Sequence, residues 1–237
     1  MKKFRPKSKR RVLTVDVGGT HVKFEVSDDA ERREFESGPK LSAKRMVATV
    51  RKMTADWRYD VVSVGYPGVV LHDRVTAEPR NLGRGWRGFD FAKAFGRPVK
   101  VVNDAVMQAV GIYQGGRMLF LGLGTGLGTA MIIDGISVPM ELAHLPYRKG
   151  KTFEQYIGAA GLKRLGKTKW RKYVVDVVAR LTAALEPEYV VLGGGNAEKL
   201  GKKLPPRVRL GCNDSAFDGG YRLWSEGKRG RRSMRAA

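Results

Sequence analysis

Two segments of this sequence share one arrangement: an apolar strand, a glycine-rich turn and a second strand. The first covers residues 12–27 with Gly18-Gly19-Thr20 at its turn, and the second covers residues 118–133 with Gly124-Thr125-Gly126-Leu127-Gly128. Short runs of β-branched and apolar residues favour strands, and glycines between two such runs favour a hairpin. The segments differ too much in sequence to establish an internal duplication. They predict that each half of the chain contains a sheet that opens with an antiparallel hairpin.

Strands and helices alternate through the rest of the chain. Apolar residues at helical spacing predict helices over 41–57, 89–95, 105–113, 152–165 and 169–185, and a further helix opening at Asn196. Short apolar runs predict strands over 61–64, 99–102 and 189–192. This alternation, together with the hairpins, predicts an α/β architecture with mixed sheets.

We expect two lobes that meet near residues 113–117. The N-terminal lobe is predicted to cover 12–114 and the C-terminal lobe 115–213, with a last segment, 214–226, packed back on the N-terminal lobe. Residues 1–11 and 227–237 are rich in lysine and arginine. Charged ends of this kind are usually solvated tails.

The chain is strongly basic, with 45 lysines and arginines against 23 acidic residues and a net charge of +22. Such an excess attracts polyanions, whether nucleic acid, polyphosphate or an anionic membrane. The charge alone does not distinguish among these partners. The longest apolar stretches have the length of strands, and the basic N-terminus leads into a strand instead of an apolar signal core. We therefore expect a cytoplasmic protein with no membrane partner.

A single cysteine, Cys212, excludes an intrachain disulfide framework and a cysteine-rich structural zinc site. This usage suits the reducing cytoplasm. Because cysteine is among the most often buried residues, we expect Cys212 to be buried or half-buried.

Three glycine clusters each follow an apolar strand: the two hairpin turns and Gly193-Gly194-Gly195, which precedes Asn196. Glycine lets backbone N–H groups approach an anion, and a helix N-terminus adds partial positive charge. One such cluster alone is more often a simple turn. Three in one short chain favour phosphate binding.

Two aspartates follow predicted strands or lie near their ends. Asp104 could accept a proton from a hydroxyl group, or it could cap the helix that begins at residue 105. Asp16 suits Mg²⁺ bound through water, or it could accept hydrogen bonds from the N–H groups of its turn. Glu141 and His144 are three residues apart and share a face if their segment is helical. A lone histidine would ordinarily be structural.

Taken in order, these motifs resemble those of the ROK sugar kinases, and most closely their polyphosphate glucokinase branch. Asp16-Val17-Gly18-Gly19-Thr20-His21-Val22-Lys23 resembles the first phosphate motif and the Gly124 turn the second. Asn103-Asp104 resembles the catalytic pair, Gly65-Tyr66-Pro67-Gly68 the sugar-domain turn, Glu141-Leu142-Ala143-His144 the sugar-binding motif and Gly193-Gly194-Gly195-Asn196 the adenosine-side motif. The resemblance covers roughly residues 12–224.

The resemblance implies a two-lobed actin/hexokinase-like, ribonuclease H-like fold with a cleft between the lobes. It implies Mg²⁺-dependent transfer of phosphate from polyphosphate or ATP to the 6-hydroxyl of glucose or mannose, in a homodimer. Asp104 would be the base and Asp16 the magnesium residue, while Asn81, Asn103, Asp104, Glu141 and His144 would bind sugar. The donor would contact Gly18, Gly19, Thr20, Lys23, Gly124, Thr125, Gly126, Gly193, Gly194, Gly195 and Asn196.

Departures from the family pattern affect the expected substrate more than the expected reaction. Ala143 replaces the glycine that usually precedes the histidine, and the cysteine-rich zinc motif is absent, so we expect no zinc. For polyphosphate, the basic residues of nearby loops suggest a track along Arg84, Arg87, Lys149 and Lys151, although these could be ordinary solvated charges. Two alternatives stay open: a kinase that uses only ATP on another hexose, and a non-catalytic protein that senses sugar or binds nucleic acid.

Overall fold

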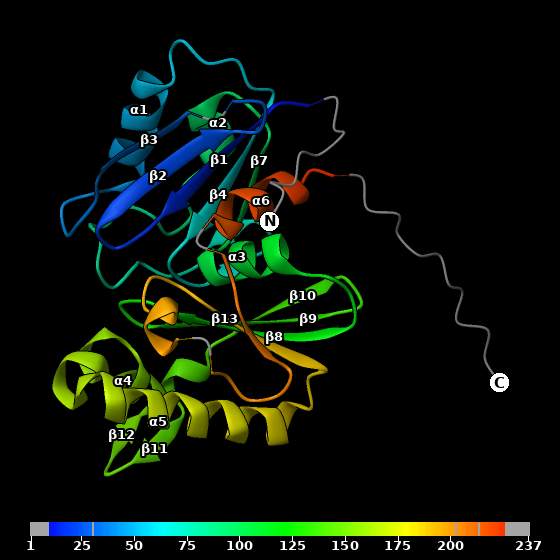
Figure 1. Ribbon diagram of the computed structural model, residues 1–237. Helices are drawn as coiled ribbons and strands as arrows, with labels where there is room; N and C mark the ends of the chain where they lie inside the picture. The colour runs from blue at the N-terminus through cyan, green and yellow to red at the C-terminus, as the bar shows by residue number, and fades with distance from the viewer. Residues whose placement is uncertain (1–9, 30, 202, 213, 226–237) are drawn as a thin grey trace.

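The computed structural model describes residues 10–29, 31–201, 203–212 and 214–225. Residues 1–9 of the first basic tail, the whole of the second tail, 227–237, and Glu226 lie outside the described residues. Figure 1 shows two lobes, one above the other, each built around a five-stranded sheet. No helix of the described residues is long and apolar enough to cross a membrane.

The upper-lobe sheet has the order β3-β2-β1-β4-β7. β1 and β2 form the antiparallel hairpin expected from the first glycine turn, while β1, β4 and β7 run parallel. All residues of β4 are buried because helices α1 and α2 cover one face of the sheet and α6 covers the other. The bounds are β1 (Val12–Val17), β2 (His21–Val26), β3 (Arg32–Glu36), β4 (Val61–Tyr66), β7 (Val99–Asn103), α1 (Ala43–Met53), α2 (Phe91–Phe95) and α6 (Ser215–Arg222).

The lower-lobe sheet has the order β10-β9-β8-β13-β14. Its hairpin, β8 with β9, is the one expected from the second glycine turn. The long helix α5 packs on one face through Trp170, Val174 and Val177, and α3 packs on the other through Val106 and Ile112. The bounds are β8 (Arg117–Leu123), β9 (Leu127–Ile133), β10 (Ile136–Met140), β13 (Tyr189–Gly193), β14 (Val208–Leu210), α3 (Asp104–Ile112), α4 (Phe153–Ile157) and α5 (Ala159–Leu185).

Helices α3 and α6 cross between the two sheets (Figure 1). Two glycines make this crossing close: a methyl group at Gly111 would collide with the backbone of Ser215, and one at Gly219 with the carbonyl of Met107. The backbone of α6 also bonds to the upper sheet, where the Ser63 hydroxyl donates to the carbonyl of Gly220 at 2.7 Å. Helix α6 thus connects α3 to the sheet of the upper lobe.

Several short elements complete the lobes. β5 and β6 form a hairpin in the upper lobe, whereas β11 and β12 form one at the base of the lower lobe (Figure 1). Two 3₁₀ helices, η1 and η2, follow β10 and β13. The bounds are β5 (Val70–Leu71), β6 (Arg74–Val75), β11 (Pro146–Arg148), β12 (Lys151–Thr152), η1 (Leu142–His144) and η2 (Ala197–Leu200).

The structure differs from the sequence-based expectations at two helical segments and at Cys212. The helix expected over 152–165 breaks at Gly158 into α4 and α5. Within α5 the backbone of Gly166 is not helical (φ 72°, ψ 159°), so α5 is kinked in the gap expected between the helices 152–165 and 169–185. The helix expected at Asn196 is only the 3₁₀ turn η2. Cys212 is exposed, contrary to its expected burial, because it lies in the loop that connects β14 to α6.

Candidate active site

Asp16 and Asn103 lie near the same edge of the upper sheet. Asp16 is on β1 opposite Gly65 of β4, and the next β4 residue, Tyr66, lies opposite Asn103 of β7. Gly65 leaves room here: a methyl group at this position would collide with the side chain of Met107 and would lie 3.5 Å from Oδ1 of Asp16. Asp104 follows Asn103 as the first residue of α3. The parallel strands therefore bring both predicted aspartates to one edge.

The two aspartates influence each other electrostatically. Burial raises the pKa of Asp16 to about 6, and the charges of Lys23 and Arg32 oppose this rise. The pKa of Asp104 rises to about 7, mainly through burial and further through the negative charges of Asp16 and Glu141. Two carboxylates with raised pKa values in one place form an environment that favours a proton or a cation.

Asn103, and not Asp104, caps helix α3. Its Oδ1 accepts hydrogen bonds from the N–H groups of Ala105 at 3.0 Å and Val106 at 3.3 Å, while its Nδ2 donates to the carbonyl of Gly68 at 3.1 Å. The capping role that the sequence also allowed for Asp104 therefore belongs to Asn103. Asp104 accepts at Oδ1 from the N–H of Ala105 at 2.8 Å, which fixes the position of its carboxylate.

The predicted sugar-binding pair lies at η1 in the lower lobe. Glu141 precedes η1 and His144 ends it, and His144 Nε2 lies 3.9 Å from Glu141 Oε2. A third residue comes from the upper lobe, since Arg80 Nη2 lies 3.2 Å from His144 Nε2. In a hydrogen bond between these two atoms the arginine N–H is the donor, because a guanidinium has no acceptor. Sequence reasoning missed Arg80, and its only signal was its position next to Asn81.

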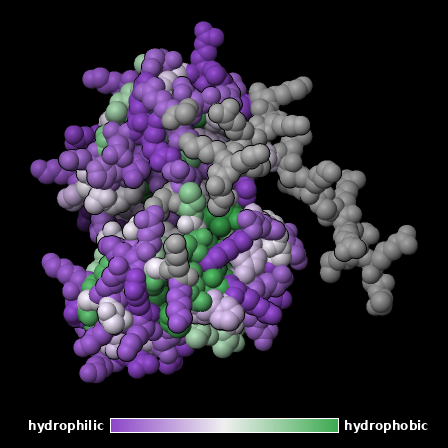
Figure 2. Space-filling view, in the orientation of Figure 1, coloured by the Kyte–Doolittle hydropathy of each residue, from purple (hydrophilic) through white to green (hydrophobic). Residues whose placement is uncertain are grey.

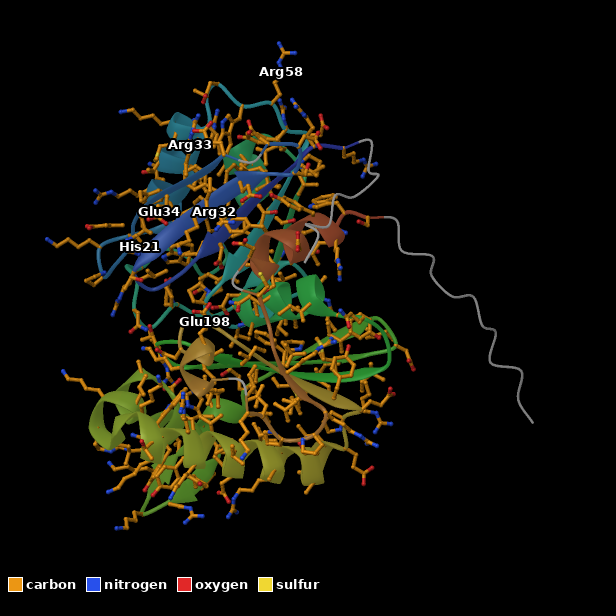
Figure 3. All side chains as sticks on the ribbon, in the orientation of Figure 1. His21, Arg32, Arg33, Glu34, Arg58 and Glu198 are labelled. Atoms are coloured by element: carbon orange, nitrogen blue, oxygen red, sulfur yellow. The ribbon has the colours of Figure 1, made fainter. Side chains whose placement is uncertain are left out.

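Asn81 lies beside the first glycine turn. A methyl group at Gly19 would lie 3.8 Å from the Cβ of Asn81. In this turn the N–H of Gly18 donates to the carbonyl of His21 at 2.9 Å, and Thr20 is exposed. Lys23 lies on β2, with Nζ 3.9 Å from Glu34 Oε2. Figure 3 shows His21, Arg32, Arg33 and Glu34 on the β2–β3 side of the upper lobe.

The second and third glycine clusters contact each other in the lower lobe. The N–H of Ala159, at the start of α5, donates to the carbonyls of Gly124 and Thr125 at 3.1 and 3.2 Å. Asn196 Nδ2 also donates to the Gly124 carbonyl, at 3.1 Å. Gly194 has φ 81°, and a methyl group there would come within 2.8 Å of the backbone of Leu123. Gly126 belongs to the second turn, whereas Gly193 ends β13 and Gly195 follows Gly194 in the third cluster.

The second glycine hairpin also lies close to the start of α3. A methyl group at Gly128 would come within 2.9 Å of the Cβ of Ala105, the residue after Asp104. Glu154 of α4 supports this hairpin by accepting from the N–H of Leu127 at 3.2 Å. The predicted donor turns and the predicted base are therefore connected through direct contacts in the fold.

Comparison with known proteins gives the family of this chain. The ROK family model matches residues 12–139, more than half of the chain. The chain belongs to the ROK family. Among its ROK relatives is a polyphosphate glucokinase from Mycobacterium tuberculosis, 28% identical over 221 residues that cover 84% of this chain and 82% of that protein.

Solved structures show that the ROK chain has the two-lobed actin/hexokinase-like fold. An inorganic polyphosphate/ATP-glucomannokinase from Arthrobacter superimposes with a TM-score of 0.77 at 24% identity, covering 89% of this chain and 96% of that one. A ROK glucokinase from Streptomyces griseus, solved with glucose and AMPPNP, gives a TM-score of 0.74 at 20% identity, covering 90% and 98%.

Proposed function

We propose that this protein transfers a terminal phosphoryl group from polyphosphate, ATP or both to the 6-hydroxyl of glucose, with mannose as a second acceptor. The observation that carries the proposal is the pair Asp16 and Asp104, which lie at one sheet edge near the predicted donor turns and sugar residues. ROK membership and the similarity to glucokinases support the same reaction. These names describe the relatives, and the reaction of this chain is our inference from them.

Asp104 is the proposed general base. Its pKa of about 7 is suited to proton transfer near neutral pH, where the carboxylate is available and still basic. It would accept the proton of the 6-hydroxyl as the oxygen attacks phosphorus. Phosphoryl transfer requires little other covalent chemistry from a protein, so positioning and charge neutralisation account for most of the rate.

The acceptor and donor are assigned to different sets of residues. Glu141 and His144 from the lower lobe and Asn81 from the upper lobe would hold the sugar, because their acceptors and donors suit hydroxyl groups. Asn103 would add the second N–H of its amide, because its Oδ1 caps α3 and its other N–H donates to Gly68. The glycine turns would hold the donor through backbone N–H groups, with Ala159 at the start of α5 directly beside the second turn. Residues from both lobes would thus enclose the sugar and exclude water from the transfer.

The residues present also fit a magnesium ion. Within the described residues there is no group of three or more histidines, cysteines and acids that could hold a metal ion on its own. Magnesium usually takes only one or two carboxylates and completes its shell with water and phosphate, and Asp16 beside Asp104 supplies such a pair. When bound, the ion would neutralise charge on the transferred phosphate. We propose Asp16 as the residue that holds it, through water.

The test is a purified-protein assay with glucose and Mg²⁺ that compares polyphosphate with ATP and includes Asp104→Asn. We expect the wild type to form glucose 6-phosphate and the variant to lose at least about 100-fold in kcat while still binding glucose. Activity with ATP alone would indicate the narrower ATP-dependent kinase. Absence of activity with every donor and hexose would contradict the proposal and favour a sugar-sensing protein.

A further inference from the structure

The first half of α5 has an unbalanced charge. Residues 159–172 contain no acidic residue and six basic ones: Lys163, Arg164, Lys167, Lys169, Arg171 and Lys172. The exposed lysines Lys163 and Lys167 take part in no ion pair with any residue that the structure describes. A helix that leaves so many like charges in solvent pays a repulsive cost that a bound polyanion would remove.

This basic helix begins at the second glycine turn. The N–H of Ala159, its first residue, contacts the carbonyls of Gly124 and Thr125. From there α5 runs along the lower lobe, with a kink at Gly166 between Lys163 and Lys167 (Figure 1). A linear anion held at the Gly124 turn by its reacting end would therefore have the basic side chains of α5 beside it as it leaves the site.

A second line of contacts joins the same turn to the middle of α5. Asn196 Nδ2 donates to the Gly124 carbonyl, and Lys199 Nζ donates to Asn196 Oδ1 at 2.7 Å. Arg171 Nε then donates to the carbonyl of Lys199 at 2.7 Å. The turn η2 is thus held between the glycine turn and α5, and Lys199 and Arg171 lie along this path, with Lys167 one helical turn before Arg171.

Acidic side chains near this path are few. Glu154 uses Oε2 to accept from the N–H of Leu127, so it supports the hairpin. Glu198 is exposed on η2, and Figure 3 shows it near the junction of the two lobes. The net charge along the path stays positive.

From these contacts we propose that Lys163, Lys167, Arg171 and Lys199 form a binding track for a long polyphosphate chain whose terminal phosphate lies at the Gly124 turn. The inference rests on the proposed function for its donor. It replaces the track expected through Arg84, Arg87, Lys149 and Lys151, because Lys149 and Lys151 belong to the β11–β12 hairpin at the base of the lower lobe, whereas Arg84 and Arg87 belong to an upper-lobe loop. Polyphosphate is favoured over nucleic acid because the track begins at a predicted phosphate turn.

The experiment measures direct binding by calorimetry, so it does not depend on turnover. The probes are long linear polyphosphate, tripolyphosphate and a short DNA duplex, each titrated into the wild type and into Lys163→Gln/Lys167→Gln. We expect the double variant to bind long polyphosphate about tenfold more weakly and to lower the slope of log K against log salt by about one to two. Tripolyphosphate binding should change by less than about twofold, because it is too short to reach the track.

The matched control is Lys44→Gln/Lys52→Gln, which removes two exposed lysines from α1 of the upper lobe. It should leave long-polyphosphate binding unchanged. Arg171 also supports η2, so its charge is tested by comparing polyphosphate binding of Arg171→Gln with that of Arg171→Lys. Thermal unfolding of both variants identifies a folding defect.

Three results would overturn the track: equal losses in the control, equal losses with tripolyphosphate, or an equal loss with the DNA duplex, which would indicate a general polyanion surface. Unchanged polyphosphate binding in Lys163→Gln/Lys167→Gln would also reject it. None of these results affects the proposed kinase reaction, which fails only if no donor phosphorylates a hexose.

Discussion

Two adjacent glycines that directly follow β13, Gly194 and Gly195, have different surroundings. Gly194 has a positive φ and would place a methyl group against the Leu123 backbone, whereas a methyl group at Gly195 would meet open space. We expect Gly194→Ala to lower the free energy of unfolding by about 1–3 kcal/mol. Gly195→Ala should stay within about 0.5 kcal/mol of the wild type. Urea unfolding measures both, and equal effects would contradict a specific backbone requirement at Gly194.

A pH-dependent contribution to stability is expected at Asp176 on α5. Hydrogen bonds from Tyr147 and Arg180 hold the pKa of Asp176 below its usual range, although partial burial opposes them. A carboxylate whose pKa is lower in the folded protein stabilises it above the unfolded value of about 3.9, and this contribution is lost as pH falls through the folded value.

Asp176→Asn should therefore lower the urea midpoint at pH 7 and have a smaller effect near pH 3.5, below the unfolded value of about 3.9, because the unfolded chain then takes up the proton and part of the contribution is lost. Paired urea titrations of the wild type and the variant at the two pH values measure this difference. A gap between the two proteins that stays constant across the pH range would show that packing, and not charge, explains the role of Asp176.

Individual site residues could be predicted from sequence only where a motif named them. The glycine turns identified Asp16, and Asp104 followed a predicted strand, and the structure brings both to one edge of the upper sheet. Their catalytic and metal-binding roles stay predictions. Arg80 could not be predicted because its contact with His144 joins residues 64 positions apart in a polar loop without periodicity. The capping bonds of Asn103 likewise depend on the path of the backbone.

At the scale of elements, the crossing of α3 and α6 is the contact most sensitive to side-chain size. Alanine normally stabilises a helix relative to glycine by about 0.5–1 kcal/mol. Gly219→Ala should instead destabilise the protein, because its methyl group would collide with the Met107 carbonyl. Thermal and urea unfolding test this, and we expect a loss of about 1–3 kcal/mol. An unchanged or raised stability would show that the helices can separate at little cost.

Strands made of short continuous apolar runs were predictable, but edge elements were not. β3 consists of Arg32, Arg33, Glu34, Phe35 and Glu36, and its charged residues resemble a loop in sequence although they protect the edge of a sheet from further pairing. Arg32 has a tertiary role as well, because it pairs with Glu25 and Asp214. Such ion pairs cannot be predicted from the sequence, because they join residues that are close only in the folded protein. The same reason explains why α6, with two adjacent glycines, was not expected as a helix.

At the scale of the whole molecule, the contact between Arg80 and His144 links the lobes where the sugar is proposed to bind. We expect glucose to bring the lobes closer, because its hydroxyls would be held by residues from both. Small-angle X-ray scattering should then show a smaller radius of gyration with glucose than without it. Asp104→Asn replaces the carboxylate with an amide that can still hydrogen-bond to glucose, so this variant should also show the smaller radius of gyration. An unchanged radius in the presence of bound glucose would contradict closure.

The division near residues 113–117 and the homodimer stay predictions at this scale. On the face that Figure 2 shows, the upper lobe is mostly hydrophilic and apolar side chains gather on the lower lobe. Apolar surface of this kind is where a second copy could bind. Sedimentation of the purified protein over a range of concentrations tests the homodimer.

The order in which the lobes can finish folding follows from α6. Phe217 and Tyr221 cover Val12 and Val61, so β1 is partly buried by a helix that follows it by about 200 residues along the sequence. A ribosome releases the N-terminal half of the upper lobe long before it releases this helix. Until residues 215–222 have left the ribosome, the sheet has an uncovered apolar face, and a chain that stops before them would retain that exposed face and be prone to aggregate.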